Sequence, residues 1–410
     1  MSENHEGFCV KSFKYRIPET NVPPTEDFDF AEALESVYPL LETVFSYLNY
    51  QELKICCQVK KSWEEVAETV LSRRTTPSWF TCYKVRGRRK NKGHVFKHST
   101  NLNNSNVGTA IILYDYCMIK LHEYICLHTD NFDLSRKTVP EYLEEEIIPQ
   151  NTDYCVLSCA KVVSCFEAPK EQRSSPSCDI IVGLIIPKIP NVRTAMFHYK
   201  VNKKDATEIG QYVRENDQVK CLLMFSTRNL NKSAYNGLLT ILIPECFAQM
   251  VAVGGGIIMG TKTFQHVKPT KRVYSSSDIF CIAFIQDRSI AANFNAYSYV
   301  ILGDDLTKED FTKELQKFRS NIKLREKSVA FRICCSAKVG AEEETALVNK
   351  VFPNIPVLGF NAGGELGWNC FSNTMKDGGE DGIHPKKRIK QKYPSVYQQW
   401  STVLVILTWS

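Results

Sequence analysis

The residues that could do chemistry in this chain gather around two glycine-rich segments. In the first, Gly254-Gly255-Gly256 follows the apolar run 250–253, and phosphate-binding turns also follow a strand. The spacing does not fit such a turn, because Met259 takes the last glycine position of Gly-x-Gly-x-x-Gly and no Gly-Lys-Ser/Thr is present. We therefore interpret this segment as a tight turn or a place of close packing, and we expect no nucleotide cofactor.

In the second segment, Gly363 and Gly364 precede the carboxylate of Glu365. Glycines give the backbone freedom to expose an acidic side chain at a strand end. Two roles stay open for Glu365. It could bind an amine or a basic substrate residue, or it could cap backbone amides. Gly363, Gly364 and Glu365 are accordingly our candidate ligand or substrate site.

Other chemistries lack the residues they need. None of the 8 histidines stands four residues from another on a clear helix face, and no Gly-x-Ser-x-Gly elbow occurs. The 16 cysteines include no Cys-x-x-Cys pair, and Cys155, Cys159 and Cys165 have no histidine nearby. Cys334-Cys335 lies in an apolar run, which favours a structural role over a nucleophile. We predict no catalytic residue, no metal site and no enzymatic activity.

Composition is ordinary for a soluble globular protein. The chain has 410 residues, of which 43% are hydrophobic and 23% charged, with a net charge of +6. Many cysteines without a visible signal peptide indicate reduced thiols in the cytoplasm or the nucleus. The apolar run 403–407 is too short to span a membrane and is typical of a buried closing strand.

Two basic runs, 84–97 and 386–392, interrupt this ordinary composition. Neither is interleaved with aromatic residues in the manner of a single-strand binder, so we do not expect a nucleic-acid partner. Solvated loops are the favoured interpretation, and nuclear localisation signals are the alternative.

The elements that must position these residues begin with three helical patterns between Phe30 and Leu71. Steps of three and four place one apolar face on each pattern. The third is predicted to open with a capping box at Ser62 and Glu65. So small a unit buries little apolar surface alone, and its excess of apolar residues suggests a partner protein. The first face comprises Val37, Leu40, Leu41, Val44, Phe45 and Leu48, the second Leu53, Cys56, Cys57 and Val59, and the third Trp63, Val66, Ala67, Val70 and Leu71.

This segment resembles an F-box, the module that docks substrate receptors onto the Skp-type adaptor of cullin–RING ubiquitin ligases. The run 44–48 fits the end of the F-box helix, and Leu53, Val59 and Trp63 fit the later positions. Two departures are the missing Leu-Pro start at Ser36-Val37 and the lysine at position 60. The resemblance implies adaptor binding by Val37, Leu41, Val44, Phe45, Leu48, Leu53, Val59 and Trp63. The alternative is a helical hairpin that packs on the rest of the protein.

Beyond the helical unit, continuous apolar runs alternate with amphipathic patterns, which predicts a mixed α/β fold. One helix is expected from about Lys308 to Ile322, with Thr307 as its N-cap. We see no exact short repeat, although two similar-sized β-rich halves are one interpretation. The expected division is a tail at 1–28, the F-box at 29–75, a basic and asparagine-rich linker at 76–108, and two α/β parts at 109–270 and 271–410.

The segment 352–367 carries a second resemblance. A strand runs into a glycine turn and then into Gly364-Glu365-Leu366-Gly367, which resembles the C-terminal signature of the FIST domain. The runs 181–187 and 251–256 also fit this family. F-box followed by FIST implies a non-catalytic substrate receptor of a Skp–cullin–F-box ligase, which promotes degradation of bound proteins. A small ligand for the FIST part stays open, as does the alternative of a small-molecule sensor whose helices only pack in cis.

Overall fold

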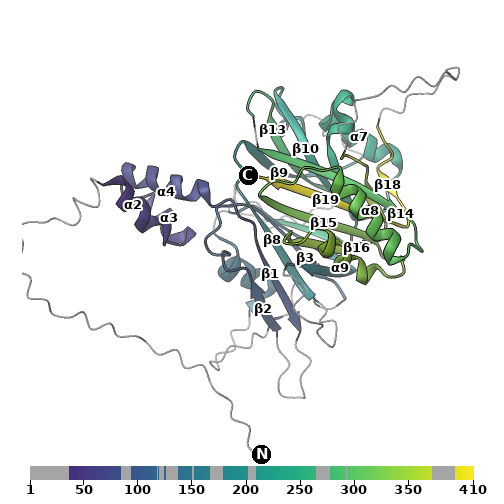
Figure 1. Ribbon diagram of the computed structural model, residues 1–410, viewed down its shortest axis with the longest axis horizontal. Helices are drawn as coiled ribbons and strands as arrows, with labels where there is room; N and C mark the ends of the chain where they lie inside the picture. Colours follow the sequence, from purple (N-terminus) through teal and green to yellow (C-terminus); the bar gives the residue numbers. More distant parts are fainter. Residues whose placement is uncertain are drawn as a thin grey trace, which may run out of the picture.

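The computed structural model describes residues 37–84, 94–117, 119, 124–125, 137–149, 152–166, 179–201, 209–264, 278–291, 293–371 and 393–410 (Figure 1). The expected tail at 1–28 and the basic run 386–392 lie outside these residues. The described chain forms a small helical domain at 37–74 and a larger β-body that begins at Ser78 (Figure 1). The mixed α/β class expected from the sequence is confirmed.

The helical domain has the three expected helices, α2 (Tyr38–Ser46), α3 (Tyr50–Cys56) and α4 (Lys61–Arg73). Asn49 caps α3 in a reciprocal capping box with Glu52. The capping box predicted at Ser62 is wrong, because α4 already begins at Lys61 and its N-cap residue, Lys60, does not cap the helix with its side chain. Ser62 therefore lies inside the first turn of the helix.

Three mixed sheets form the β-body. The first sheet has the order β12-β6-β3-β8-β1-β2, with strands Gly260–Phe264, Tyr154–Cys159, Val107–Asp115, Asp179–Pro187, Ser78–Lys84 and His94–His98. The second has the order β18-β17-β11-β10-β13-β9, with strands Tyr397–Gln398, Glu365–Gly367, Ala252–Ile257, Asp217–Ser226, Ile279–Asp287 and Val192–Tyr199. The third has the order β14-β19-β15-β16-β7, with strands Phe294–Leu302, Ser401–Trp409, Lys327–Cys335, Val357–Ala362 and Lys161–Cys165. A two-stranded sheet pairs β4 (Tyr124–Ile125) with β5 (Lys137–Thr138).

The same four-strand pattern occurs in each large sheet. In the first sheet β3 is parallel to β6 and antiparallel to β8, which is antiparallel to β1. The second sheet repeats this arrangement with β10, β11, β13 and β9, and the third repeats it with β15, β16, β19 and β14. The strands of each repeat also follow one another along the chain in the same order. The β-body is therefore a threefold repeat, where the sequence suggested at most two halves.

The three repeats exchange strands in a cycle. The strand after β6 is β7, which pairs with β16 of the third repeat. The strand after β11 is β12, which pairs with β6 of the first, and the strand after β16 is β17, which pairs with β11 of the second. The chain consequently does not divide into two parts near residue 270, because β7 and β17 each complete a distant sheet.

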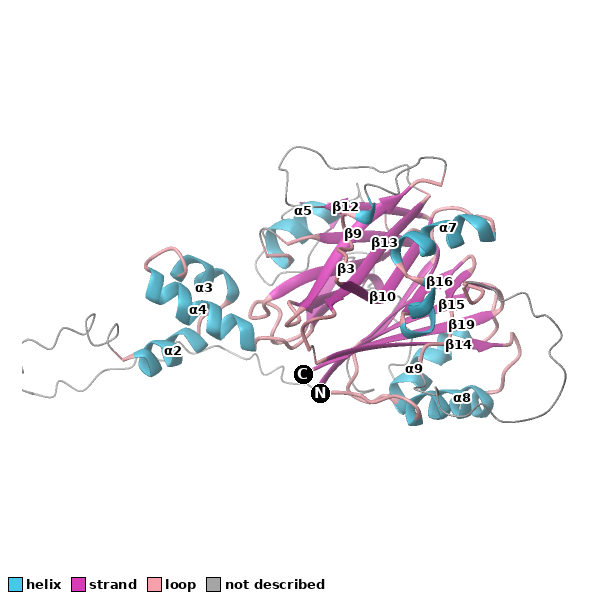
Figure 2. Ribbon diagram, turned by 90° about the horizontal axis from the view of Figure 1, so that it is seen from above, coloured by secondary structure: helices cyan, strands magenta, loops and turns pink. Residues whose placement is uncertain are grey.

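Helices cover the outer faces of the sheets, and the inner faces meet in one core (Figure 2). Buried residues from all three sheets contribute to that core, including Leu113, Phe225 and Phe360. The outer helical segments are α5 (Val139–Tyr142) with η1 (Leu143–Ile147), α7 (Lys232–Leu242) with η2 (Glu245–Met250), α8 (Lys308–Ser320) and α9 (Ala341–Val351). The predicted cap of α8 is confirmed, since Thr307 accepts the backbone N–H of Asp310.

The segment 76–108 is not a linker throughout. It contains β1, whose pairing with β8 adds it to the first sheet, and β2, which forms the edge of that sheet. The basic run 84–97 was expected to be a loop, and its last part, from His94, is therefore strand instead. At the other end of the chain, 403–407 lies in β19, which is buried between β14 and β15 as expected of a closing strand.

Candidate functional site

The outer side of the helical domain exposes a stripe of apolar side chains. Val37, Leu40, Val44 and Tyr47 recur at steps of three and four, so they share one side of α2. We call these four residues the α2 stripe. Of the fourteen large hydrophobic residues exposed in the described part of the chain, seven lie between Val37 and Val59. Such a concentration is typical of interaction surfaces.

The residues predicted to bind an adaptor divide into two groups. Val37, Val44 and Val59 are exposed, whereas Leu41, Phe45 and Leu53 are buried in the core of the helical domain. Leu48 and Trp63 are half-buried and pack against the same core. The Phe45 and Trp63 rings meet edge to face with centroids 5.3 Å apart. Truncating Phe45 would therefore disturb the fold of this domain as well as any docking.

Sequence reasoning did not select four exposed residues for docking, namely Tyr38, Leu40, Tyr47 and Ile55. Apolar residues occupy both sides of α2, so periodicity alone could not separate the side that faces the core from the side that faces solvent. The signal that could have found the second side is the spacing of Leu40 and Tyr47 from Val44.

Arg74 joins the helical domain to the β-body. Its Nη2 donates to the carbonyl oxygens of Ser46 and Leu48 at 3.0 and 2.7 Å, where the last turn of α2 leaves carbonyls without helical partners. Its Nη1 lies 3.3 Å from the carbonyl oxygen of Asn104, and Tyr50 N–H donates to Asn103. Burial lowers the pKa of Arg74. One side chain thus links α2, α4 and the loop before β3.

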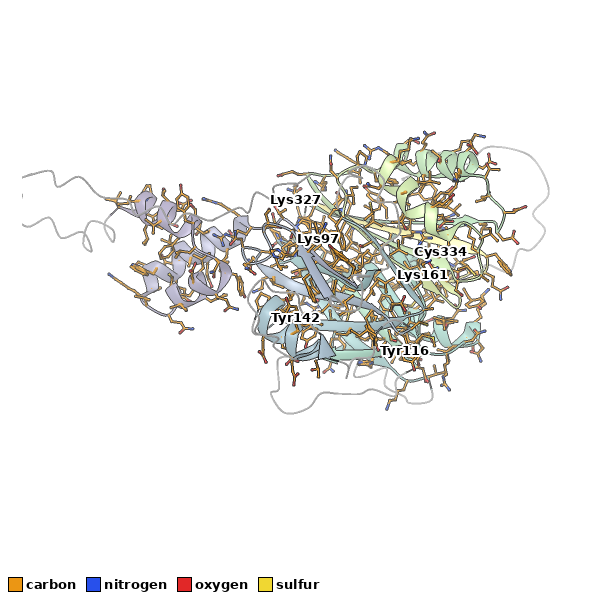
Figure 3. The ribbon with its side chains drawn as sticks, turned by 90° about the horizontal axis from the view of Figure 1, so that it is seen from below. Lys97, Tyr116, Tyr142, Lys161, Lys327 and Cys334 are labelled. Atoms are coloured by element: carbon orange, nitrogen blue, oxygen red, sulfur yellow. The ribbon has the colours of Figure 1, made fainter. Side chains whose placement is uncertain are left out.

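The next residue, Thr75, is held from the opposite end of the sequence. Trp409 Nε1 donates to the Thr75 carbonyl oxygen at 2.8 Å, and Lys327 Nζ donates to its hydroxyl at 2.7 Å. The helical domain therefore meets the β-body where β19 ends and β15 begins. Figure 3 shows Lys327 on the side of the β-body that faces the helical domain, and Cys334, at the other end of β15, farther from that domain.

A cluster of buried charges lies at that far end of β15, between the strand and α9. Arg332 Nη2 is 2.9 Å from Glu344 Oε2, and Lys338 Nζ is 2.7 Å from Glu344 Oε1. Thr402 donates to Glu344 at 2.8 Å, and Arg332 also donates to the carbonyl oxygen of Ala341. The side chains of Arg332, Lys338 and Glu344 are 0%, 2% and 7% exposed, so water contributes little to their stabilisation.

The protonation states follow from these neighbours. Burial by itself raises the pKa of Glu344, but the charges of Arg332 and Lys338 outweigh it and lower the pKa below its ordinary value. Burial raises the pKa of the Cys334 thiol to about 11, so Cys334 is not a thiolate at neutral pH. The cluster is consequently an ionic network without an activated nucleophile.

The internal repeat gives this cluster a comparison within the same chain. On β3 the outward residues that pack against the covering helix include Ile112 and Tyr114, and on β10 they include Leu222 and Met224. The corresponding stretch of β15 has Arg332 and Cys334. At these matched positions, two of the three repeats have apolar or aromatic side chains, and the third has the charged side chain of Arg332.

Glu365 lies on the inner side of the same region. The expectation that it is exposed is wrong, since it is fully buried in β17. Its Oε2 accepts the backbone N–H and the hydroxyl of Ser401 at 3.2 and 2.9 Å, which is the capping role left open by the sequence. Burial raises its pKa, against the lowering effect of the Ser401 hydrogen bonds. Gly363 and Gly364 form the turn before it.

The glycine run of β11 is a place of close packing. Gly255 has φ of 146°, and a Cβ atom there would lie 1.7 Å from the carbonyl oxygen of Met224. The run lies within a strand that is covered on both faces. The close-packing interpretation is confirmed for Gly255.

A comparison with protein-family models found no match for this chain. A comparison with curated proteins found none either. Among the described residues, no helix is long and apolar enough to span a membrane, and no group of three or more histidine, cysteine, aspartate or glutamate residues could hold a metal ion.

Proposed function

We propose that this chain is the substrate-binding subunit of a Skp–cullin–F-box ubiquitin ligase. The observation that carries this proposal is the α2 stripe. Its apolar side chains remain exposed in the full chain, as expected of a helix whose partner is another protein. The F-box resemblance of residues 44–63 gives that partner its class, a Skp-type adaptor bound to a cullin–RING scaffold.

Such a subunit needs no chemistry of its own. A conjugating enzyme recruited by the RING protein supplies the reactive thioester, and the receptor supplies proximity between that thioester and a substrate lysine. The joint at Arg74 and Thr75 suits this task, because it ties the helical domain to the β-body through side chains from both ends of the chain. A captured protein would then be held at a defined place relative to the adaptor.

The sensor alternative requires the helices to pack only against the rest of the chain. In the structure Tyr47 is 85% exposed, and Ile55 and Val59 are also exposed. Packing in cis therefore leaves this apolar surface without a role, which favours the receptor proposal.

The test is co-purification of the full chain with a Skp-type adaptor. Val44→Ser/Tyr47→Ser alters only exposed positions, so the helical domain should stay folded while adaptor affinity falls by at least about tenfold. Met250→Ser removes an exposed apolar residue of the β-body and is the matched control. Circular dichroism checks the fold of each variant. Unchanged adaptor binding by the double variant, or no binding by the wild type, would refute the proposal.

A further inference from the structure

Arg332 has one hydrogen-bond donor without a partner, although its side chain is fully buried between β15 and α9. Its Nε and Nη2 both donate to Glu344 Oε2, at 3.2 and 2.9 Å, and Nη2 also donates to the carbonyl oxygen of Ala341. Its Nη1 has no hydrogen-bond partner among the described residues. An unmade hydrogen bond of a buried charged group is costly, so a bound acceptor would stabilise this donor.

The charges around Arg332 do not balance. Arg332 and Lys338 share a single carboxylate, because Glu344 pairs with one cation through each of its oxygens. Cys334 is neutral, since burial raises the pKa of its thiol to about 11. Glu365 lies on the inner face of the sheet, where it is hydrogen-bonded, and it forms no ion pair with either cation. The layer between β15 and α9 therefore holds two buried positive charges and one negative charge, which favours a further negative charge beside Arg332.

The neighbouring strand places no side chain beside Arg332. In the parallel pairing of β15 with β16 its partner is Gly359, and a Cβ atom at Gly359 would lie 3.6 Å from the Cβ atom of Arg332. At the matched positions of the other two repeats the partners are Val156 and Val253, which are buried in the clusters beneath their own helices. The third repeat thus has an arginine beside a glycine where each of the others has two aliphatic side chains.

Asn361 adds a second polar group to this layer. It is two residues from Gly359 on β16, and Phe360 between them belongs to the inner core, so Gly359 and Asn361 share the outer face. Asn361 lies opposite Cys334 in the strand register, and its buried Oδ1 has no partner among the described residues. Rotation of the amide by half a turn exchanges its oxygen and its N–H₂ group, so Asn361 can also donate.

We propose that this layer binds a small monovalent anion of the size of chloride. Arg332 Nη1 and the Asn361 amide donate to the ion, and Gly359 leaves it the place that a valine side chain fills in the other two repeats. The ion supplies the second negative charge and accepts the unmade hydrogen bond of Arg332. A place of that size excludes phosphate and larger organic anions. This inference goes beyond the ligase proposal and does not depend on it.

The experiment follows urea unfolding of the full chain by tryptophan fluorescence. Chloride is replaced stepwise by gluconate, an anion too large for the site, at constant ionic strength. An ion that binds only the folded state raises the ratio of folded to unfolded protein in proportion to its concentration above its dissociation constant. We therefore expect that ratio to rise up to about tenfold for each tenfold rise in chloride, and bromide should act like chloride.

Two variants locate the ion, and a third is the matched control. Arg332→Met removes the donor and its charge, so the chloride dependence should disappear whatever the stability of the variant. Gly359→Ala keeps the arginine and adds a methyl group beside it, so it should weaken the dependence. Arg319→Met removes an exposed arginine from α8 of the same repeat and should keep the dependence of the wild type.

Equal stability of the wild type in chloride and gluconate would overturn the inference, because water alone would then serve Arg332 Nη1. So would a chloride dependence that Arg332→Met retains, or one that Arg319→Met loses equally, because the ion would then act elsewhere. A loss confined to Arg332→Met and Gly359→Ala supports the site. Adaptor co-purification is a separate measurement, so either proposal can fail without the other.

Discussion

Replacing Glu344 with alanine should lower the free energy of unfolding of the β-body by about 3–5 kcal/mol. The change removes the carboxylate that pairs with Arg332 and Lys338 and accepts the Thr402 hydroxyl. Both cations would stay buried without a counter-charge, and that uncompensated charge is the main cost. A protein of ordinary stability has 5–15 kcal/mol in total, so the loss should be large enough to measure directly.

Arg332→Met is the informative comparison. It removes one cation and leaves Glu344 paired with Lys338, 2.7 Å away, so one positive and one negative charge remain. Methionine also fills much of the space of the arginine side chain. We therefore expect Arg332→Met to destabilise the protein less than Glu344→Ala does, although each change removes a charge from the cluster.

Urea unfolding followed by tryptophan fluorescence measures both variants, and pH supplies a second readout. Since the pKa of Glu344 is lowered in the folded protein, its stabilising effect is present above the unfolded value and is lost as pH falls through the folded value. The difference between wild type and Glu344→Ala should shrink when pH falls below the ordinary value of 4.5. A Glu344→Ala loss below about 1 kcal/mol, or one no larger than that of Arg332→Met, would refute the electrostatic reasoning.

Three further changes test other parts of the structure. Glu365→Gln should stabilise the protein near neutral pH but not in acid. Because the pKa of Glu365 is raised in the folded protein, its protonated side chain stabilises the fold fully below the unfolded pKa, and this stabilisation is lost as pH rises through the folded pKa. Urea titrations at two pH values measure the difference. Arg74→Ala should speed hydrogen exchange at the Tyr50 amide, which donates to Asn103, and should leave adaptor binding intact. The control change at the exposed neighbour, Arg73→Ala, should leave the exchange rate of that amide unchanged. Gly255→Ala should cost at least about 2 kcal/mol in urea unfolding, because its Cβ would overlap the Met224 carbonyl.

The sequence predicted local elements better than it predicted their assembly. Helices α2 and α3 and the cap at Thr307 follow from periodicity and capping residues, which act within a few positions of each other. The threefold repeat was missed because the repeated unit is a pattern of pairing. Strands buried on both faces give continuous apolar runs, and such runs do not reveal which strand lies beside which.

The candidate sites show the same limit. Glu365 was selected as a candidate site because Gly363 and Gly364 precede it. In the structure its buried carboxylate accepts the hydroxyl of Ser401, a residue far along the chain, and the local sequence does not reveal this contact. The cluster of Arg332, Lys338 and Glu344 was not predicted, since its members come together only when α9 packs on β15. One local signal did exist, an arginine within the apolar run 329–335, because such a residue is rarely buried without a partner.

The asymmetry of a repeated body indicates where its function lies. Three equivalent layers between strand and helix would be stabilised equally well by aliphatic side chains, and a buried ion network adds little stability over an apolar alternative. At the matched strand positions of the described residues, only β15 carries a charged side chain, Arg332, and its ion network with Glu344 and Lys338 lies at the end of that strand. The joint at Thr75 lies at the start of β15, so one nine-residue strand, about 30 Å long, connects the two regions. Under the proposed receptor function, a strand in the middle of a buried sheet would supply a rigid connection between the joint at Thr75 and the far end of the β-body.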